Sequence, residues 1–310
     1  MRAVTQRRFG GPEVLEPAER ARPRLRVNEV LVRVRAAGVN PIDALVRSGG
    51  VPFLGEPPFV LGWDVSGVVE AVSPGVTRFA VGDEVCGMPL IPREAGCYAE
   101  YVAAPARQLV RKPAALDHQQ AAGLSLAGLT AWQALVDAAG VGRGDRVLVH
   151  GGGGGVGHLA VQIAKARGAE VIATASAAKQ AFVAGLGADQ VVDYRAADFT
   201  TEVKDADVVL DTVGGDTAVR SLDVLRPGGR LVTVVELHDA ALPAGAAGRG
   251  LEFSAVTAEP DHVGLGALAA LAEEGRLRVH VDRVFPLAEA ARAHRLIESG
   301  STTGKLVLTV

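Results

Sequence analysis

A run of five glycines, residues 151–155, constrains the fold of this chain more than any other feature of the sequence. The run follows residues 147–150, which are apolar enough for a buried strand, and precedes residues 156–167, which have the pattern of a helix. It contains two overlapping spacings, G-x-G-x-x-G starting at Gly152 and G-x-x-G-x-x-G starting at Gly151. A strand, a glycine turn and a helix in this order are typical of a dinucleotide-binding loop.

The physical basis is the absence of a side chain where the backbone must approach a phosphate group. Without a Cβ the chain turns tightly and its N–H groups can reach a pyrophosphate, while the helix N-terminus offers free donors and a favourable dipole. We therefore predict that a cofactor pyrophosphate binds to Gly151, Gly152, Gly154, Gly155, Val156 and Gly157. The alternative is a glycine-rich loop without a ligand, but the repeated strand and helix units around it favour dinucleotide binding.

Strands and helices alternate along the middle of the chain. Beyond the glycine loop we expect strands at residues 170–175, 191–192, 207–211 and 230–235, and helices at residues 179–186 and 217–225. Residues 117–140, rich in Ala and Leu, form the helix that leads into this part. Alternation of this kind predicts an α/β fold with a doubly wound parallel sheet and right-handed crossovers.

The first third of the chain has a different character, because short strands broken by turns replace the alternating pattern. Candidate half-buried strands lie at residues 30–36, 65–72 and 97–102. The last part of the chain adds two helices and two strands, which we assign to the same β-rich domain. We therefore expect one domain built from residues 1–120 and completed by 262–310, and a dinucleotide-binding domain of residues 121–261.

Charge and cysteine content exclude several classes of protein. The chain has 32 Lys and Arg residues against 35 Asp and Glu, and this net charge of −3 gives no electrostatic basis for binding nucleic acid or an anionic membrane. We find neither a signal peptide nor a run of about 20 apolar residues that would span a membrane. Cys86 and Cys97 are too few for a secreted disulfide framework or a four-cysteine zinc lobe, so we expect a cytoplasmic protein.

The residues after the strand at 170–175 indicate which dinucleotide is bound. An NAD site usually has an acidic residue there, which holds the ribose 2′-OH, but this chain has no carboxylate at that place. Ser176 and Lys179 stand there instead, and Tyr194 follows the next strand. A hydroxyl, an ammonium and a phenol suit a 2′-phosphate, so we predict NADP (NADPH) as the cofactor. The alternative is that Lys179 is a solvated helix residue and Tyr194 a half-buried strand end.

Several motifs together resemble the medium-chain dehydrogenase/reductase superfamily over nearly the whole chain. They are AGVNPID at 37–43, GWDVSGVV at 62–69, VGDEV at 81–85 and GLTAW at 128–132, with the glycine loop and the ending from Ala293-His294 to Gly304-Lys305. The resemblance is greatest to the zinc-independent, quinone-oxidoreductase-like (zeta-crystallin-like) branch. It implies a GroES-like catalytic domain, a Rossmann domain and a homodimer, for which the edge strand at residues 251–256 is the candidate contact.

Zinc enzymes of this superfamily carry a catalytic Cys and a Gly-His-Glu motif, and this chain has neither. The first position falls near Asn40, and the second is occupied by Gly62-Trp63-Asp64, whose indole cannot bind zinc. We interpret the scattered histidines as surface or locally hydrogen-bonded residues: His118, His150, His158, His238, His262, His280 and His294. We therefore predict that the protein holds no metal.

The resemblance implies that the nicotinamide of NADPH lies near Asn40 and Thr130. We predict catalytic roles for both, with the Asn40 amide donating to an acceptor oxygen or the ribose and Thr130 bonding the nicotinamide carboxamide. The alternatives are that Asn40 is a turn residue before Pro41 and that Thr130 bonds its own helical turn. Asp43 and Asp64 are expected to hold the Asn40 loop or to cap a helix.

Hydride transfer without a metal requires an electron-poor acceptor whose developing negative charge can spread to oxygen. The relatives often carry tyrosines shortly after the Asn40 loop, whereas residues 44–53 contain none. We interpret Arg47 there as a solvated side chain, with binding of an anionic group as the alternative. We therefore predict an NADPH-dependent reductase of a small electrophilic substrate, either a quinone or an α,β-unsaturated carbonyl. The alternatives are an enoyl-thioester reductase of a lipid or polyketide pathway and a non-enzymatic NADPH-binding regulatory protein.

Overall fold

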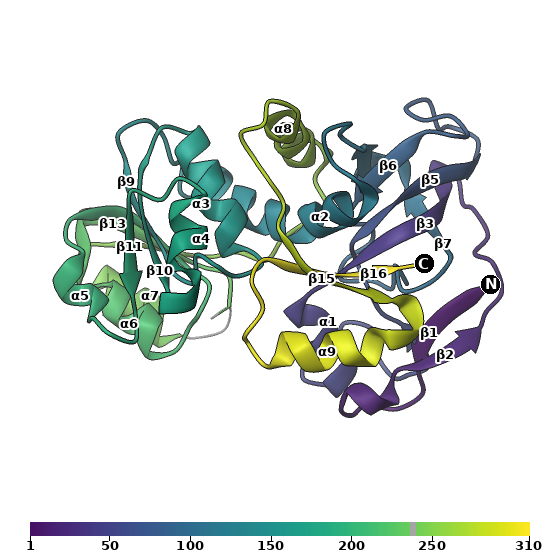
Figure 1. The fold of residues 1–310 in the computed structure, drawn as a ribbon, viewed down its shortest axis with the longest axis horizontal. Helices are drawn as coiled ribbons and strands as arrows, with labels where there is room; N and C mark the ends of the chain where they lie inside the picture. The colour runs from purple at the N-terminus through teal and green to yellow at the C-terminus, as the bar shows by residue number, and fades with distance from the viewer. Residues whose placement is uncertain (236–239) are drawn as a thin grey trace. The chain divides into compact units, whose positions relative to one another are not determined.

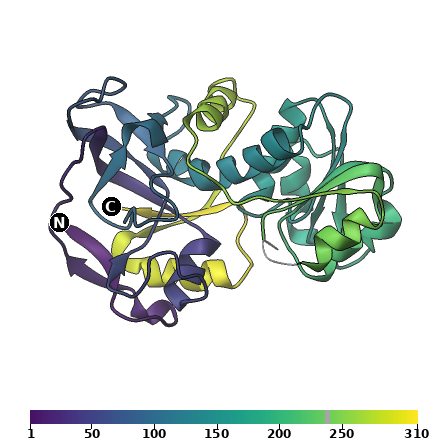
Figure 2. The same ribbon diagram turned by 180° about the vertical axis from the view of Figure 1, so that it is seen from behind.

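The computed structural model describes residues 1–235 and 240–310 and divides the chain into two compact units. The first unit contains Met1–Leu129, Glu259–Gly275 and Val279–Val310, and the second contains Thr130–Ala258 and Arg276–Arg278. Both chain ends therefore belong to the first unit, as Figures 1 and 2 show. Among the described residues, no helix is both long and apolar enough to span a membrane.

The second unit is built on a six-stranded parallel sheet in the order β11-β10-β9-β12-β13-β14. Its strands are β9 (Arg146–Val149), β10 (Glu170–Ala175), β11 (Gln190–Asp193), β12 (Ala206–Asp211), β13 (Leu225–Thr233) and β14 (Glu252–Ala255). Its helices are α3 (Gly157–Ala166), α4 (Gln180–Ala184), α5 (Phe199–Glu202), α6 (Asp216–Ser221) and α7 (Ala241–Ala247). Helices α3 and α4 lie on one face of the sheet and α5, α6 and α7 on the other (Figure 1), which confirms the predicted doubly wound α/β fold.

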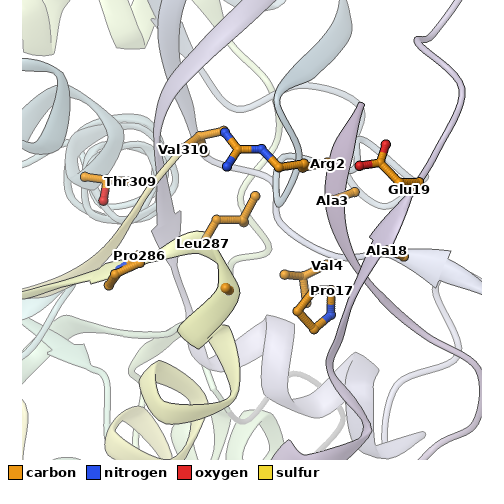
Figure 3. A pocket seen from close by; sticks show the side chains of 11 residues that line it. Arg2, Ala3, Val4, Pro17, Ala18, Glu19, Pro286, Leu287, Thr309 and Val310 are labelled. Carbon is orange, nitrogen blue, oxygen red and sulfur yellow. The ribbon is translucent and has the colours of Figure 1, made fainter.

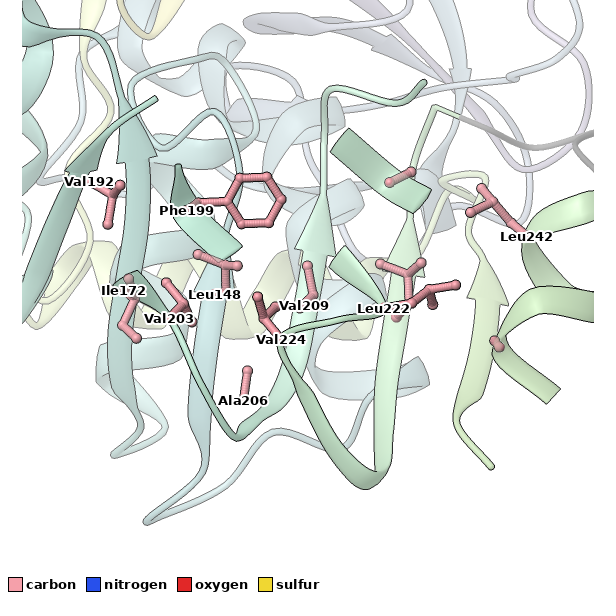
Figure 4. Close-up of a cluster of buried hydrophobic side chains, with 13 residues drawn as sticks. Leu148, Ile172, Val192, Phe199, Val203, Ala206, Val209, Leu222, Val224 and Leu242 are labelled. Carbon is pink, nitrogen blue, oxygen red and sulfur yellow. The ribbon is translucent and has the colours of Figure 1, made fainter. Parts of the chain in front are cut away.

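Alternate side chains of the central strands pack against α5, α6 and α7 and form the core shown in Figure 4. Leu148 and Val209 of the central strands are fully buried, and Phe199 and Leu222 of the helices are only 5% exposed. Full burial of each such side chain is worth roughly 1.5–3 kcal/mol. This core fixes the strands rigidly, so it also fixes the carboxyl edge of the sheet from which the glycine loop emerges.

The first unit contains two sheets. The seven-stranded sheet has the order β15-β16-β3-β5-β6-β8 with β7 also pairing with β3, and the three-stranded sheet has the order β2-β1-β4. The strands are β1 (Arg2–Gln6), β2 (Glu16–Glu19), β3 (Glu29–Val39), β4 (Phe59–Val60), β5 (Val65–Val72), β6 (Glu84–Gly87), β7 (Tyr101–Pro105), β8 (Leu109–Arg111), β15 (Val281–Pro286) and β16 (Lys305–Thr309). The last strand, β16, pairs antiparallel with β3, so the end of the chain completes the sheet that its beginning starts.

Four helices accompany these sheets: α1 (Pro41–Ser48), α2 (His118–Trp132), α8 (His262–Glu273) and α9 (Ala290–Glu298). Short 3-10 turns lie at Pro12–Val14, Ala106–Gln108, Ala177–Lys179 and Leu287–Glu289. Helix α2 starts in the first unit and continues into a π-helical turn, Gln133–Ala138, of the second. The helix predicted at residues 117–140 therefore exists, with its last turn wound more loosely than an α-helix.

The strand expected at residues 97–102 is wrong in its first half. Strand β7 begins at Tyr101, whereas the backbone N–H groups of Cys97 and Tyr98 donate to the carbonyl oxygens of Gly62 and Leu61 at 3.1 and 3.0 Å. Gly62 has a φ of +96°, and a Cβ there would lie 2.5 Å from the Tyr98 ring. The segment therefore packs on this glycine turn, a tertiary contact that strand alternation does not reveal.

Candidate functional site

The glycine loop joins β9 to α3 with no room for side chains at its key positions. Gly151 has a φ of +65°, a left-handed conformation that favours glycine. A Cβ added to Gly157 would lie 2.1 Å from the Gly151 carbonyl oxygen, so the loop backbone packs directly on the first turn of α3. The sequence places glycines where the backbone itself occupies the space that a side chain would need.

The loop presents several unused backbone donors. The N–H groups of Gly152 and Gly154 are used internally, at 2.9 Å from the Thr174 carbonyl oxygen and 2.8 Å from that of Gly151. Four others have no acceptor within residues 1–235 and 240–310: Gly153, Gly155, Val156 and Gly157. Free N–H groups at the N-terminus of a ten-residue helix form a cradle for an anion, so the loop fits a dinucleotide pyrophosphate. Gly153, which we did not predict, is one of the four donors.

His150 holds the start of this loop in place through hydrogen bonds and is not a metal ligand. Its Nδ1 lies 3.1 Å from Thr174 Oγ1, and its Nε2 lies 2.9 Å from Ser221 Oγ. The Thr174 hydroxyl oxygen also accepts the Gly151 N–H at 3.1 Å. Burial lowers the pKa of His150 to about 4, so the ring is neutral near pH 7. The histidine therefore ties the loop to β10 and α6.

The three residues predicted to hold a 2′-phosphate lie together at the carboxyl edge of the sheet. The parallel register of β10 and β11 brings Ser176 and Tyr194 out next to each other. The side chain of Lys179 lies over the glycine loop, because a Cβ on Gly153 would be 2.8 Å from its Cδ. The Tyr194 side chain is 52% exposed and therefore accessible to a ligand.

Arg195 is a further cation at this edge, for which we did not predict a role. Its guanidinium carbon lies 5.6 Å from the centroid of the Tyr194 ring, and both side chains are exposed. A cation directly after Tyr194 was visible in the sequence, but only the strand register shows that it lies at the same edge as Ser176.

In the first unit, Asn40 is the centre of a buried group of polar side chains. Its Nδ2 donates to Asp64 Oδ2 at 2.9 Å, and its Oδ1 accepts a hydrogen bond from the Lys305 ammonium. Lys305 Nζ lies 3.6 Å from Asp64 Oδ2, and the second oxygen of Asp64 accepts the Leu126 N–H at 2.6 Å. Burial raises the pKa of Asp64, and the Lys305 ammonium opposes this. We did not predict a role for Lys305, although a lysine at the start of an apolar strand is a visible signal.

A second chain of hydrogen bonds begins at Asp43, in the first turn of α1. Asp43 Oδ2 accepts the Asn40 backbone N–H at 2.7 Å and the Tyr98 hydroxyl at 3.0 Å. The Tyr98 oxygen lies 3.2 Å from His294 Nε2, and Arg47 Nη1 lies 3.1 Å from His294 Nδ1. Arginine only donates, so His294 accepts at Nδ1 and donates from Nε2. Asp43 therefore holds the Asn40 loop, as one of the two expectations stated.

The interpretation of Arg47 as a solvated side chain is wrong. Arg47 is only 2% exposed, because α9 covers it, and its Nη2 donates to Glu298 at 2.5 Å. Burial, and then the Arg47 charge, lower the pKa of His294 to about 3, so the histidine remains neutral beside it. Tyr98 provides a phenol near Asn40. Because Tyr98 is distant in sequence from residues 44–53, where relatives carry tyrosines, its position along the chain did not indicate this placement.

Asp43 gives the protein a pH-dependent stability that can be measured. Burial raises the pKa of Asp43 to about 7, so the folded chain binds more protons than the unfolded chain between about pH 4 and pH 7. As pH rises through this window, we expect the free energy of unfolding of the wild-type protein to fall relative to that of Asp43→Asn by an amount on the order of 4 kcal/mol. Above about pH 7 we expect no further relative loss. Urea unfolding of both proteins at a series of pH values measures this, and parallel curves would contradict the assignment.

The side chains around Asn40 do not fit a zinc ion. They offer an amide, two carboxylates and an ammonium, whereas Trp63 is fully buried and donates from Nε1 to the Arg93 carbonyl oxygen at 2.7 Å. Within the described parts of the chain, no three His, Cys, Asp or Glu side chains form a group that could hold a metal. Burial raises the pKa of the Cys86 thiol to about 12 and raises the pKa of the Cys97 thiol well above its usual value, so neither favours the thiolate that binds zinc. His238 lies outside the described residues.

Thr130 is a buried residue of α2 and the first residue of the second unit, whereas Asn40 belongs to the first unit. Its catalytic role stays a prediction, as does that of Asn40. A pocket of about 560 Å³ in the first unit, lined by β1, β2 and residues near the end of the chain, contains none of the predicted site residues (Figure 3). Its lining is largely apolar, so we do not assign the chemistry to it.

Comparison with known proteins gives the same architecture. Residues 26–114 match the alcohol dehydrogenase GroES-like domain family, and residues 186–308 match the family described as zinc-binding dehydrogenase. The quinone oxidoreductase of Sus scrofa is 35% identical over 99% of this chain and 97% of its own length. The structure of the quinone oxidoreductase from Coxiella burnetii has a TM-score of 0.95 and 38% identity, covering 100% of this chain and 99% of its own. The Escherichia coli quinone oxidoreductase complexed with NADPH has a TM-score of 0.90 and 30% identity, covering all of both chains.

A GroES-like unit joined to a Rossmann unit with a glycine loop defines an oxidoreductase of the medium-chain dehydrogenase/reductase type. The chain belongs to this superfamily, in its quinone-oxidoreductase-like branch. The predicted family, fold class and enzyme class are thereby confirmed. The name of the matching zinc-binding family describes relatives, and the residues around Asn40 do not supply the zinc ligands in this chain.

Proposed function

We propose that this NADPH-dependent oxidoreductase reduces a quinone or an α,β-unsaturated carbonyl and does so without zinc. The observation that carries the proposal is the set of side chains around Asn40, which offers fixed hydrogen-bond donors and no soft metal ligands. Such a site can stabilise negative charge on a conjugated oxygen by hydrogen bonding. The E. coli quinone oxidoreductase complexed with NADPH supports the choice of cofactor and substrate class.

Each group of residues has a distinct part in this proposal. When bound, NADPH supplies a hydride from its nicotinamide ring. The loop N–H groups and the N-terminus of α3 hold the pyrophosphate, and Ser176, Lys179 and Tyr194 hold the 2′-phosphate. Asn40 donates a hydrogen bond to the substrate oxygen or the ribose, and Thr130 orients the carboxamide. Solvent supplies the final proton, because an enolate or hydroquinone anion is readily protonated.

NADPH oxidation with a small panel of acceptors tests the proposal. The panel contains 1,4-benzoquinone, a naphthoquinone, an alkyl enone and crotonyl-CoA, each repeated with NADH. We expect turnover of the quinones or the enone, with a preference for NADPH. Selective turnover of crotonyl-CoA would favour an enoyl-thioester reductase instead, and tight NADPH binding without turnover of any acceptor would contradict the proposed substrate class.

The absence of zinc from the mechanism is tested separately. We expect the purified protein to contain well under one zinc per chain and to keep its full rate after dialysis against a strong chelator. Elemental analysis and the same NADPH assay measure these quantities. One zinc per chain together with loss of the rate on chelation would overturn the ligand argument, because the protein would then hold a catalytic metal.

We also propose a homodimer formed through β14, the edge strand of the six-stranded sheet. An edge strand leaves backbone groups unpaired, and pairing across a two-fold axis satisfies them. We expect light scattering at micromolar concentration to give twice the 31.9 kDa chain mass. Ala255→Lys, at an exposed edge position, should shift the mass toward the monomer, whereas Ala115→Lys on an exposed loop should not. A wild-type monomer would refute the proposal.

A reducing, cytoplasmic location completes the proposal. Cys86 and Cys97 are both buried free thiols, which fits a protein that needs no oxidising compartment.

A further inference from the structure

The carboxamide of Asn40 is held in one orientation by two opposite charges. The Lys305 ammonium can only donate and the Asp64 carboxylate can only accept, so Oδ1 must face Lys305 and Nδ2 must face Asp64. A flipped amide would place its N–H groups against the ammonium and its carbonyl against the carboxylate. The two charged neighbours therefore remove the ambiguity that an isolated asparagine has.

Glycines on neighbouring segments make this arrangement possible. A Cβ on Gly38 would lie 2.6 Å from both Asp64 Oδ2 and the Ala122 carbonyl oxygen, so only glycine admits the carboxylate there. Gly304, just before Lys305, has a φ of +67°, and a Cβ there would lie 2.4 Å from the His280 carbonyl oxygen. The Lys305 backbone N–H donates to that same oxygen at 2.9 Å, which fixes where β16 starts.

The Asn40 amide has one hydrogen-bond donor left for a ligand. Nδ2 carries two hydrogens, of which Asp64 takes one, so one N–H remains for a ligand. Asn40, Asp64 and Lys305 are each at most 2% exposed, so this donor is rigid and little screened by water. A donor fixed before the reaction costs no reorganisation when charge develops on a substrate oxygen.

We propose that Lys305 and Asp64 are positioning residues that hold the Asn40 carboxamide in one orientation, so that its remaining N–H is the fixed hydrogen-bond donor to the substrate oxygen. The inference rests on the proposed role of Asn40 in the reduction. It adds two residues that act through Asn40 and do not themselves touch the substrate.

A kinetic cycle tests whether the two residues act through Asn40. Replacing both charges together, by Asp64→Asn with Lys305→Met, avoids leaving one buried charge without its partner. We expect this double variant to lower kcat roughly tenfold at an unchanged Kd for NADPH. Adding Asn40→Ala to it should give the kcat of Asn40→Ala alone, within about twofold. Lys165→Met with Asp189→Asn removes a more exposed Lys–Asp pair in the second unit and should leave kcat unchanged. Multiplying losses in the triple variant would overturn the proposal.

A spectroscopic readout tests the orientation without any turnover. The chain contains only two asparagines, Asn28 and Asn40, so selective ¹⁵N-asparagine labelling gives two side-chain amide signals. Asn40→Ala assigns them, and the exposed Asn28 serves as an internal reference. We expect the Asn40 side-chain protons to exchange slowly with solvent, and at least tenfold faster after Asp64→Asn with Lys305→Met. Because Asp64→Asn adds a third asparagine, Asn40→Ala in that double-variant background assigns the Asn40 signal there. Unchanged exchange would overturn the positioning role. If Asn40→Ala leaves kcat unchanged while the exchange result holds, the proposed function of Asn40 is wrong and its positioning is not.

Discussion

Gly157→Ala should weaken NADPH binding by roughly 10²-fold. The added Cβ would lie 2.1 Å from the Gly151 carbonyl oxygen and 2.9 Å from Gly152 Cα, and both atoms belong to the loop backbone, which has no flexible end to move. The loop must therefore shift and its free N–H groups lose their common direction. Hydrogen bonds to a charged group are each worth about 1.5–3 kcal/mol, so losing one or two gives about 3 kcal/mol. Fluorescence titration with NADPH measures the change in Kd.

The same substitution elsewhere provides the control. Gly266 lies inside α8, and a Cβ there would meet nothing within 4 Å. Gly266→Ala should leave the Kd for NADPH unchanged and raise the unfolding free energy by up to about 1 kcal/mol, because alanine favours a helix. Gly157→Ala should lower it by about 1–3 kcal/mol through overpacking. Equal Kd values for the two variants would show that the loop does not bind the pyrophosphate.

The sequence predicted the parts of this fold that depend on local pattern. The glycine run and the alternation of strands and helices were sufficient for the doubly wound sheet, because each element carries its own periodicity. The grouping of Ser176, Lys179 and Tyr194 was also predictable, since parallel strands deliver their carboxyl ends to one edge. We did not predict a role for Arg195, because only the register of the strands shows that a charged residue after one strand lies beside the end of its neighbour.

The group around Asn40 was not predictable from local pattern, since its members come from distant segments. Lys305 is 265 positions from Asn40 and reaches it only because β16 pairs antiparallel with β3. Arg47 was misinterpreted for a related reason, because the helix that buries it, α9, lies some 250 residues further on. Charged side chains usually lie at the surface of a protein, so a sequence alone predicts that they are exposed. A buried charged residue can be recognised only when it is known which segments of the chain pack together.

Ser176→Asp should change the preference between NADPH and NADH by roughly 10²-fold or more in favour of NADH. Ser176 leaves the sheet beside Tyr194, where an NAD site has a carboxylate. A phosphate ester carries about −1.5 to −2 charges near pH 7, so the new carboxylate repels the 2′-phosphate of NADPH. It also accepts a hydrogen bond from the ribose 2′-OH of NADH, worth about 1.5–3 kcal/mol. The fold should tolerate the change, because aspartate suits the N-cap of the turn at Ala177–Lys179.

The kcat/KM values for the two cofactors with one acceptor measure this preference, and Ser299→Asp provides the matched charge control. Ser299 is exposed at the end of α9 in the first unit, so its substitution adds the same charge away from the sheet edge. We expect the ratio for Ser299→Asp to equal that of the wild type. The effect of Ser176→Asp should shrink at high ionic strength, because salt screens the repulsion while leaving the hydrogen bond largely intact. An unchanged ratio in Ser176→Asp would place the 2′-phosphate elsewhere, and Lys179, Tyr194 and Arg195 would then lose their proposed role with it.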